Sequence, residues 1–351
     1  MSPLLLALAL HGTTPGTAPH LPVWPQKLQA AVVKLTRSFS GELSLYVEDV
    51  ETRARYGYNS ETPMYLASGI KVPVMIALFA ALERGDLTLD ETMVLGREDV
   101  RDGSPLLSYL RPGTPMTLGI LLEAMVRSSD NAATDLLIRR LGVDRVNREL
   151  TEQGFNEFGP ITSLLDVRRL VYYRIAPAAL EFGPLEIFDL RLVRPLKARL
   201  RRLESMAGLE DGELTLTDLD HAYRAYYLEG WNSGSMRAMG ELLAEIARRR
   251  VVSPEASEMM LRIMEGTRTG TDRLRAGLPG GVAWAHKTGT QYQRTCDFGI
   301  AFYAGRSRPV VITASIAGPR AEAERLLARI GAAVTRILGQ PAGRSRRASR
   351  P

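Results

Sequence analysis

The sequence has one cysteine and four histidines among its 351 residues. The cysteine, Cys296, cannot form an intrachain disulfide, and within the apolar stretch TCDFGIAFY it is more typical of a small buried side chain than of a nucleophile. The histidines form no cluster with Cys or Asp at ligand spacing, so we expect no metal site. Phosphate-binding loops and dinucleotide fingerprints are also absent, so we expect no cofactor.

Long apolar runs are missing as well. No stretch approaches the roughly 18 residues of a membrane-spanning helix, so we expect no integral membrane segment. The chain begins MSPLLLALALHGTTPGTAPHLPVWP, a short apolar run followed by a spacer rich in Pro, Thr and Gly. This pattern resembles a secretory signal without its usual basic start. We therefore expect residues 1–24 to be a signal peptide and linker, and the protein to be periplasmic or secreted.

The net charge gives no evidence of a nucleic-acid partner. The formal charge is +6, but Arg344, Arg346, Arg347 and Arg350 supply four of these charges. They lie in residues 340–351, which have no apolar period and are expected to form a disordered basic tail. The rest of the chain carries about +2, which is too weak a balance for a nucleic-acid-binding protein.

Strand patterns occur at both ends of the chain, with helical patterns between them. Residues 41–59 (GELSLYVEDVETRARYGYN) alternate with a period of two around a turn, and three further alternating stretches from Ala283 onward predict an antiparallel meander. The predicted fold class is therefore α+β: an antiparallel sheet built from N- and C-terminal strands and flanked by helices, with an all-helical subdomain of about residues 85–282 inserted. We expect one domain, residues 25–339.

Helical periodicity is clear except in the middle of the chain. The predicted helices are one from Pro25 and the ranges Leu66–Glu83, Leu118–Met125, Ala132–Leu141, Val143–Gln153, Ser235–Arg249, Glu255–Met264 and Ala321–Leu338. Residues 155–232 mix amphipathic segments with loop signals, and Pro195 predicts a bend there.

The first of three short motifs is SGIKVPVMIALF, in which Ser68 and Lys71 share one face if the stretch is helical. A serine hydroxyl becomes a good nucleophile when a base removes its proton. A lysine acts as that base only when burial or a second cation lowers its pKa. Taken alone, the pair is more typical of a helix start, in which Ser caps the helix and Lys extends to solvent.

The other two motifs are also weak in isolation. Ser129, Asp130 and Asn131 lie between two predicted helices, where Ser and Asp most often cap the following helix. Lys287 lies in a predicted strand within HKTGT, where Gly289 permits close approach of another backbone or a ligand.

Together, in this order and on these element types, the three motifs form the signature of class A β-lactamases and penicillin-binding proteins. The chain resembles a class A β-lactamase-like serine hydrolase of this superfamily. The resemblance extends to KVPVMIALFAALERGDLTLDE, GSPLLSYLRPGTPMTLGILLEAMVRSSDNAATDLLIRRLG and TGTDRLRAGLPGGVAWAHKTGT. It covers most of residues 28–153 and 233–337, and it implies a small β-lactam or peptide-like substrate. A monomer is expected.

The resemblance implies four catalytic residues. Ser68 would form an acyl-enzyme, and Lys71 would help to remove its proton. Ser129 would pass a proton to the leaving nitrogen, and Lys287 would lower the pKa of neighbouring groups. The backbone N–H groups of Ser68 and Thr290 would form the oxyanion hole.

The resemblance also implies a set of substrate-binding residues. Asn131 would hydrogen-bond the amide side chain of the substrate. Lys287 would bind the substrate carboxylate together with Thr288 and Thr290, and Gly289 belongs to the same strand motif. Arg273, Arg275 and Arg294 are alternatives for assisting Lys287, and the sequence does not choose among them. His286 should point to the opposite face of the strand and have a structural role.

The resemblance fails at one catalytic feature. Class A β-lactamases use a glutamate of the Ω-loop, in a Glu-x-x-x-Asn arrangement, to activate the water that hydrolyses the acyl-enzyme. No glutamate after residue 153 has this arrangement, and the corresponding segment, about residues 155–232, is much longer than a compact Ω-loop. Glu181, Glu186 and Glu229 are candidates for the missing base. The aromatic residues of this segment have helical spacing, which favours core packing over substrate stacking: Tyr223, Tyr226, Tyr227 and Trp231.

These residues leave three alternative functions. A hydrolase that is acylated at Ser68 by β-lactams or related amides agrees with the full motif set. A D-Ala-D-Ala-type peptidase or an esterase with slow deacylation agrees with the missing glutamate. A penicillin-binding sensor module without turnover would not need Ser68, Lys71, Ser129 and Lys287 together.

Overall fold

The computed structural model describes residues 23–103 and 106–339. Residues 1–22 of the expected signal peptide and linker lie outside these ranges, as does the expected basic tail, residues 340–351. Within the described ranges, no helix combines the length and the apolar character needed to cross a bilayer.

The predicted antiparallel sheet is confirmed, with strands in the order β2–β1–β9–β8–β7. Its strands are β1 (Glu42–Asp49), β2 (Arg55–Tyr58), β7 (Ala283–Gln291), β8 (Arg294–Tyr303) and β9 (Arg308–Ala317). The pair β1–β9 joins the two ends of the chain, with Glu42 opposite Ala317. As predicted, β7, β8 and β9 form a meander, and β7 is the edge strand.

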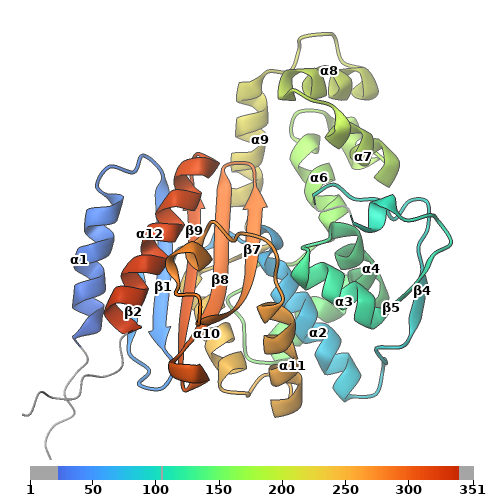
Figure 1. Ribbon diagram of the computed structural model, residues 1–351. Helices are drawn as coiled ribbons and strands as arrows, with labels where there is room; N and C mark the ends of the chain where they lie inside the picture. Colours follow the sequence, from blue (N-terminus) through green and yellow to red (C-terminus); the bar gives the residue numbers. More distant parts are fainter. Residues whose placement is uncertain (1–22, 104–105, 340–351) are drawn as a thin grey trace, which may run out of the picture.

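Both faces of the sheet are covered by helices. Along β1, Leu43, Leu45 and Val47 pack with α1 (Trp24–Thr36) and α12 (Arg320–Leu338), whereas Tyr46 points to the other face. Figure 1 shows α1 and α12 on one side of the sheet and α10 (Met236–Ala247), α11 (Pro254–Glu265) and α2 (Lys71–Glu83) on the other. A sheet covered on both faces holds its edge strand rigidly.

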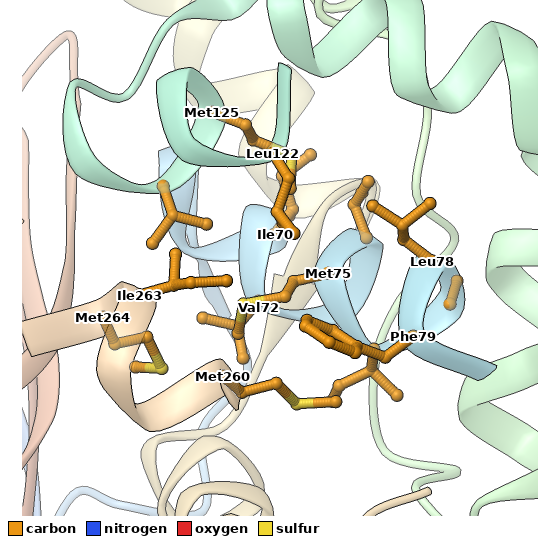
Figure 2. Packing of buried hydrophobic residues seen from close by; sticks show 14 of the residues in the cluster. Ile70, Val72, Met75, Leu78, Phe79, Leu122, Met125, Met260, Ile263 and Met264 are labelled. Carbon is orange, nitrogen blue, oxygen red and sulfur yellow. The ribbon is translucent and has the colours of Figure 1, made fainter. Parts of the chain in front are cut away.

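Helix α2 is the centre of the larger hydrophobic core. Every residue from Lys71 to Ala81 is buried, as expected for a helix that is apolar on all sides. Figure 2 shows its side chains between those of α3 (Leu118–Arg127) and α11. The contacts join Val72, Met75 and Phe79 to residues of the two neighbouring helices: Leu122, Met125, Met260, Ile263 and Met264. The N-terminal end of α2 is therefore held in a fixed position.

The chain between α2 and β7 contains three short strands as well as helices, so the inserted subdomain is not entirely helical as expected. Besides α3, α10 and α11, the helices are α4 (Asn131–Leu141), α5 (Val143–Glu152), α6 (Leu164–Tyr173), α7 (Pro184–Leu192), α8 (Leu196–Ala207) and α9 (Leu216–Leu228). The small sheets pair β3 (Met64–Tyr65) with β6 (Ser233–Gly234) and β4 (Thr92–Val94) with β5 (Pro115–Thr117). Pro195 separates α7 from α8, which agrees with the predicted bend.

The stretch 155–232 is a group of helices with a hydrophobic cluster of its own. Helices α6 to α9 (green to yellow in Figure 1) lie together at one end of the molecule. Their cluster includes Leu165, Val171, Leu190 and Leu203, and it continues to Tyr65 beside α2. The segment is thus packed structure that is anchored to the rest of the fold.

Candidate active site

Ser68 lies in a 3₁₀ turn at the N-terminal end of α2. The sequence predicts an α-helix from Leu66, but the structure has a 3₁₀ turn over Ala67–Ile70, and α2 begins only at Lys71. Ala67 has a φ of +50°, in the left-handed region, so a regular α-helix cannot extend through it. Such a conformation costs about 1–3 kcal/mol and is concentrated at functional sites. The strain therefore lies directly before the predicted nucleophile.

Lys71 is fully buried, and its amine points to the loop between α3 and α4. Nζ donates to Ser129 O (2.7 Å), Ser129 Oγ (3.2 Å), Asp130 O (3.3 Å) and Asn131 Oδ1 (2.8 Å). Lys71 makes no hydrogen bond to Ser68 within the described ranges, although the two residues were expected to share one helix face. Burial lowers the pKa of Lys71 to about 7, and the negative charge of Asp130 acts against this effect.

The Ser-Asp-Asn motif forms a tight connection between α3 and α4. Ser129 has a φ of +57°, and the Asp130 side chain caps α4 by accepting from Ala133 N (2.8 Å). Asp130 also accepts from Leu107 N (3.0 Å), which fixes the loop from a second side. The predicted capping role of Asp130 is thus observed, and it leaves Ser129 free to point its hydroxyl at the lysines.

Lys287 approaches the same hydroxyl from β7. Its Nζ donates to Ser129 Oγ (2.9 Å) and to Thr288 O (3.0 Å). Burial lowers the pKa of Lys287 well below its ordinary value, and repulsion from Lys71 and Arg273 adds to the effect. Since both amines donate to Ser129 Oγ, the proton of this hydroxyl must point elsewhere.

The strand motif lies directly against the 3₁₀ turn of Ser68. A Cβ on Gly289 would lie 2.5 Å from Leu66 O, so only glycine permits this approach, as the sequence predicts. The Thr288 hydroxyl lies 2.5 Å from that of Thr269, and the Thr290 hydroxyl accepts from an arginine. The two predicted threonines are thus held by side chains from outside β7.

Arg273 is the arginine that assists this strand. It is 3% exposed, and its Nη1 donates to two backbone carbonyls of β7 and β8 (3.0 and 2.9 Å). Its Nη2 donates to Thr290 Oγ1 (2.7 Å) and pairs with Glu324 (3.2 Å). The other two sequence candidates lie elsewhere: Arg275 donates to backbone carbonyls of its own loop, and Arg294 lies over a tyrosine ring.

One cavity of about 520 Å³ joins the three motifs. Its lining includes five of the residues predicted from the sequence: Ser68, Ser129, Asn131, Thr288 and Thr290. The other three predicted residues are buried and do not line it: Lys71, Lys287 and Gly289. A volume of this size is typical of small-molecule sites. The serine and threonine hydroxyls therefore face the cavity, and the amines of the two lysines are buried beneath its surface.

The opposite wall of the cavity comes from the helices of residues 155–232. Arg168 on α6 pairs with Asp102 (2.6 Å) and donates to Tyr223 OH (3.2 Å). Tyr223 in turn stacks on Tyr292 of the β7–β8 turn, with 4.7 Å between ring centroids. Arg168, Asp102 and Tyr292 were not predicted, because they lie far apart in the sequence and form no motif, and Tyr223 was expected to pack in the core. They connect α6 and α9 to the rest of the site.

No candidate for the water-activating base lines the cavity. Glu181, Glu186 and Glu229 are absent from its lining, and Glu186 accepts a bond from the backbone at the start of α7. Glu229 pairs with an arginine at the end of α6. Among the described residues, Asp102 is the one carboxylate in the lining, and its partner is Arg168.

The aromatic residues of this segment mainly pack, as predicted. Tyr226 and Tyr223 are buried in the cluster that contains Tyr65, and Tyr227 stacks on Tyr65 at 4.8 Å. Trp231 is partly buried against the same cluster. Tyr223 has a second role, because it also lines the cavity.

His286 and Cys296 are buried away from the cavity lining. His286 Nδ1 lies 2.8 Å from Asp297 Oδ1, which agrees with the predicted structural role. Burial raises the pKa of the Cys296 thiol to about 11, so it is not a nucleophile at neutral pH. In the part of the chain that the structure describes, no group of three His, Cys, Asp or Glu side chains is arranged to hold a metal ion.

Comparison with known proteins gives a family model and similar curated proteins. A model described as the beta-lactamase enzyme family matches residues 26–338. Beta-lactamase ROB-1 of Haemophilus influenzae is 32% identical over 130 residues, which is 36% of this chain and 41% of that protein. The carbapenem-hydrolyzing beta-lactamase KPC of Klebsiella oxytoca is 25% identical over 303 residues, which is 86% of this chain and 84% of that protein.

A solved structure supports the same fold. An acyl-enzyme complex of a PBP-A point mutant with penicillin G superimposes with a TM-score of 0.65. It is 20% identical in sequence, and the match covers 91% of this chain and 98% of that one. At this identity, the likeness concerns the fold.

Proposed function

Since the chain belongs to the beta-lactamase enzyme family, we propose that it is a serine hydrolase in which β-lactams or related amides acylate Ser68. The observation that carries the proposal is the Ser129 hydroxyl, which accepts from both Lys71 (3.2 Å) and Lys287 (2.9 Å) in the cavity that Ser68 lines. A site that only binds its ligand has no need for two buried amines on one hydroxyl.

The first step needs a neutral Lys71. The two amines titrate as a pair, and a substrate carboxylate beside Lys287 favours the charged form of Lys287. Lys71 is then the neutral member, in agreement with a pKa of about 7. The Ser68 hydroxyl makes no side-chain hydrogen bond in the described ranges, so it is free to rotate toward this amine. Lys71 takes the proton as Ser68 Oγ attacks the carbonyl carbon.

Opening of the amide follows by way of Ser129. The C–N bond breaks, and the leaving nitrogen takes the Ser129 proton, which points away from the two amines. Lys71 returns the proton that it took from Ser68, which restores the Ser129 hydroxyl. The backbone N–H groups of Ser68 and Thr290 stabilise the oxyanion, each by roughly 3 kcal/mol. The close approach of β7 to the 3₁₀ turn, at Gly289, supports the assignment of these two N–H groups to one oxyanion hole.

Slow deacylation is the second candidate property, and one observation favours it. Asp102 is the one carboxylate that lines the cavity in the described ranges, and Arg168 already occupies one of its oxygens, so it is not positioned to activate a water. The natural activity would then be that of a D-Ala-D-Ala-type peptidase or an esterase. A β-lactam would remain covalently attached to Ser68. The PBP-A mutant, which has the same fold, was solved as an acyl-enzyme with penicillin G.

A time course of intact mass after mixing with benzylpenicillin tests both statements. We expect an adduct of one penicillin on the wild-type protein that persists for minutes or longer. The Ser68→Ala variant should form none. Absence of both an adduct and penicillin consumption would refute acylation. Rapid consumption of penicillin without a lasting adduct would support the hydrolase activity and refute slow deacylation.

A further inference from the structure

The charge of the cavity wall is strongly unbalanced. Among the described residues, the lining contains one acidic side chain, Asp102, and five arginines: Arg168, Arg191, Arg199, Arg273 and Arg320. Three of these arginines pair with carboxylates, Arg168 with Asp102 and the other two with Glu324. The remaining two, Arg191 and Arg199, belong to α7 and α8.

Arg191 and Arg199 have no acidic partner in the part of the chain that the structure describes. Arg199 donates only to backbone carbonyls, at Val193 (3.2 Å) and Arg191 (3.3 Å). The Arg191 guanidinium has no hydrogen-bond or ion-pair partner at all among the described residues. The bonds of Arg199 hold the turn between α7 and α8, and both arginines line the same cavity. Two half-buried guanidinium groups without a counter-charge favour an anion.

This position differs from that of the carboxylate site predicted on β7. Thr288, Thr290 and Arg273 belong to the sheet side of the cavity, whereas α7 and α8 lie beyond α6, at the outer end of the helical group (Figure 1). The cavity is continuous between the two sides. One ligand can therefore present an anionic group to each side.

We propose that Arg191 and Arg199 form a second anion subsite, which binds a carboxylate on the acyl side chain of the substrate. The inference rests on the proposed function, because it takes the acyl donor to be the ligand. The substrate class is thus an amide or β-lactam with two separated carboxylates, one at β7 and one at the wall of α7 and α8.

Two penicillins that differ by one carboxylate test the subsite. Carbenicillin carries an additional carboxylate on the side chain of benzylpenicillin. Binding is measured by calorimetry in the Ser68→Ala background, so that no acylation interferes. We expect carbenicillin to bind about tenfold more tightly than benzylpenicillin, a preference that weakens as the salt concentration rises.

Arg191→Gln should reduce this preference to about twofold or less, and Arg191→Lys should retain part of it. Because Arg191 has no hydrogen-bond or ion-pair partner among the described residues, we expect its replacement to leave the thermal stability of the protein unchanged, which thermal unfolding checks. The control is Arg201→Gln, on α8, which has the same change of charge at a residue that is 72% exposed, pairs at 3.7 Å with the exposed Asp211 and does not line the cavity. It should keep the full preference.

Three results would overturn the inference: no preference for carbenicillin, no measurable binding of carbenicillin, or an equal loss in Arg191→Gln and Arg201→Gln. The proposed function is tested separately, by the benzylpenicillin adduct on wild-type protein. If Ser68 stays unmodified while the carbenicillin preference depends on Arg191, acylation is refuted and the subsite stands. If the adduct forms on Ser68 and carbenicillin is not preferred, acylation is supported and the second anion subsite is refuted.

Discussion

The rate of Ser68 acylation should rise steeply with pH around neutrality. Burial lowers the pKa of Lys71 from its ordinary 10.5 to about 7, which corresponds to about 5 kcal/mol. At pH 7 this makes the neutral amine roughly a thousandfold more abundant than in an exposed lysine. Between pH 6 and pH 8, the neutral fraction and therefore the acylation rate should increase about tenfold.

Stopped-flow measurement of nitrocefin or benzylpenicillin acylation from pH 5.5 to 9 gives this profile. Lys71→Met is the control, since it removes the base; its residual acylation should be at least about a hundredfold slower and show no inflection near pH 7. A wild-type rate that does not change between pH 6 and 8, or an inflection above pH 9, would refute the role of Lys71.

The stability of the protein should depend on pH through the same group. Between about pH 7 and pH 10 the unfolded chain holds the Lys71 proton and the folded chain does not. The free energy of unfolding of the wild type, relative to Lys71→Met, should therefore increase with pH in this window, by at most about 1.4 kcal/mol per pH unit. Below pH 7 both states are protonated, and the cost of burying the ammonium is present in full.

Further expected outcomes concern the proton path, deacylation and the core. Ser129→Ala should slow acylation about a hundredfold in the same stopped-flow assay, because the leaving nitrogen loses its proton donor; an unchanged rate would exclude this path. Leu164→Glu places a carboxylate in the cavity lining and should shorten the lifetime of the penicillin adduct about tenfold, whereas Leu164→Gln should not; equal lifetimes would mean that a missing base does not limit deacylation. Met75→Ala should reduce the free energy of unfolding in urea by about 2–5 kcal/mol, and a loss below 1 kcal/mol would contradict its position in the core.

The fold was largely predictable from the sequence because its elements have clear local patterns. The alternation in residues 41–59 and after Ala283 predicts the strands of the sheet, and the helical periods agree with α3, α4, α5 and α10 to α12 within a few residues. Residues 155–232 were harder to interpret. Their helices α6 to α9 bury their apolar side chains against one another and against Tyr65, a contact that local periodicity does not reveal.

The candidate site was predictable only where its residues form motifs. The positions of Ser129 and Lys287 around Lys71 follow from three short stretches. Arg273 could not be chosen over its two alternatives, because its partners lie on three different elements. The pair of Arg168 and Asp102 joins residues 66 positions apart without any pattern. The strained turn at Ala67 was also missed, since alanine normally favours helix.

The proposed function depends on Ser68 as the residue that forms the covalent bond with the substrate. Protein quenched within seconds of mixing with benzylpenicillin, digested and analysed by tandem mass spectrometry, tests it most directly. We expect one modified peptide, with the penicilloyl group on Ser68. A penicilloyl group on any other residue, or penicillin consumption with Ser68 unmodified at every quench time, would contradict it.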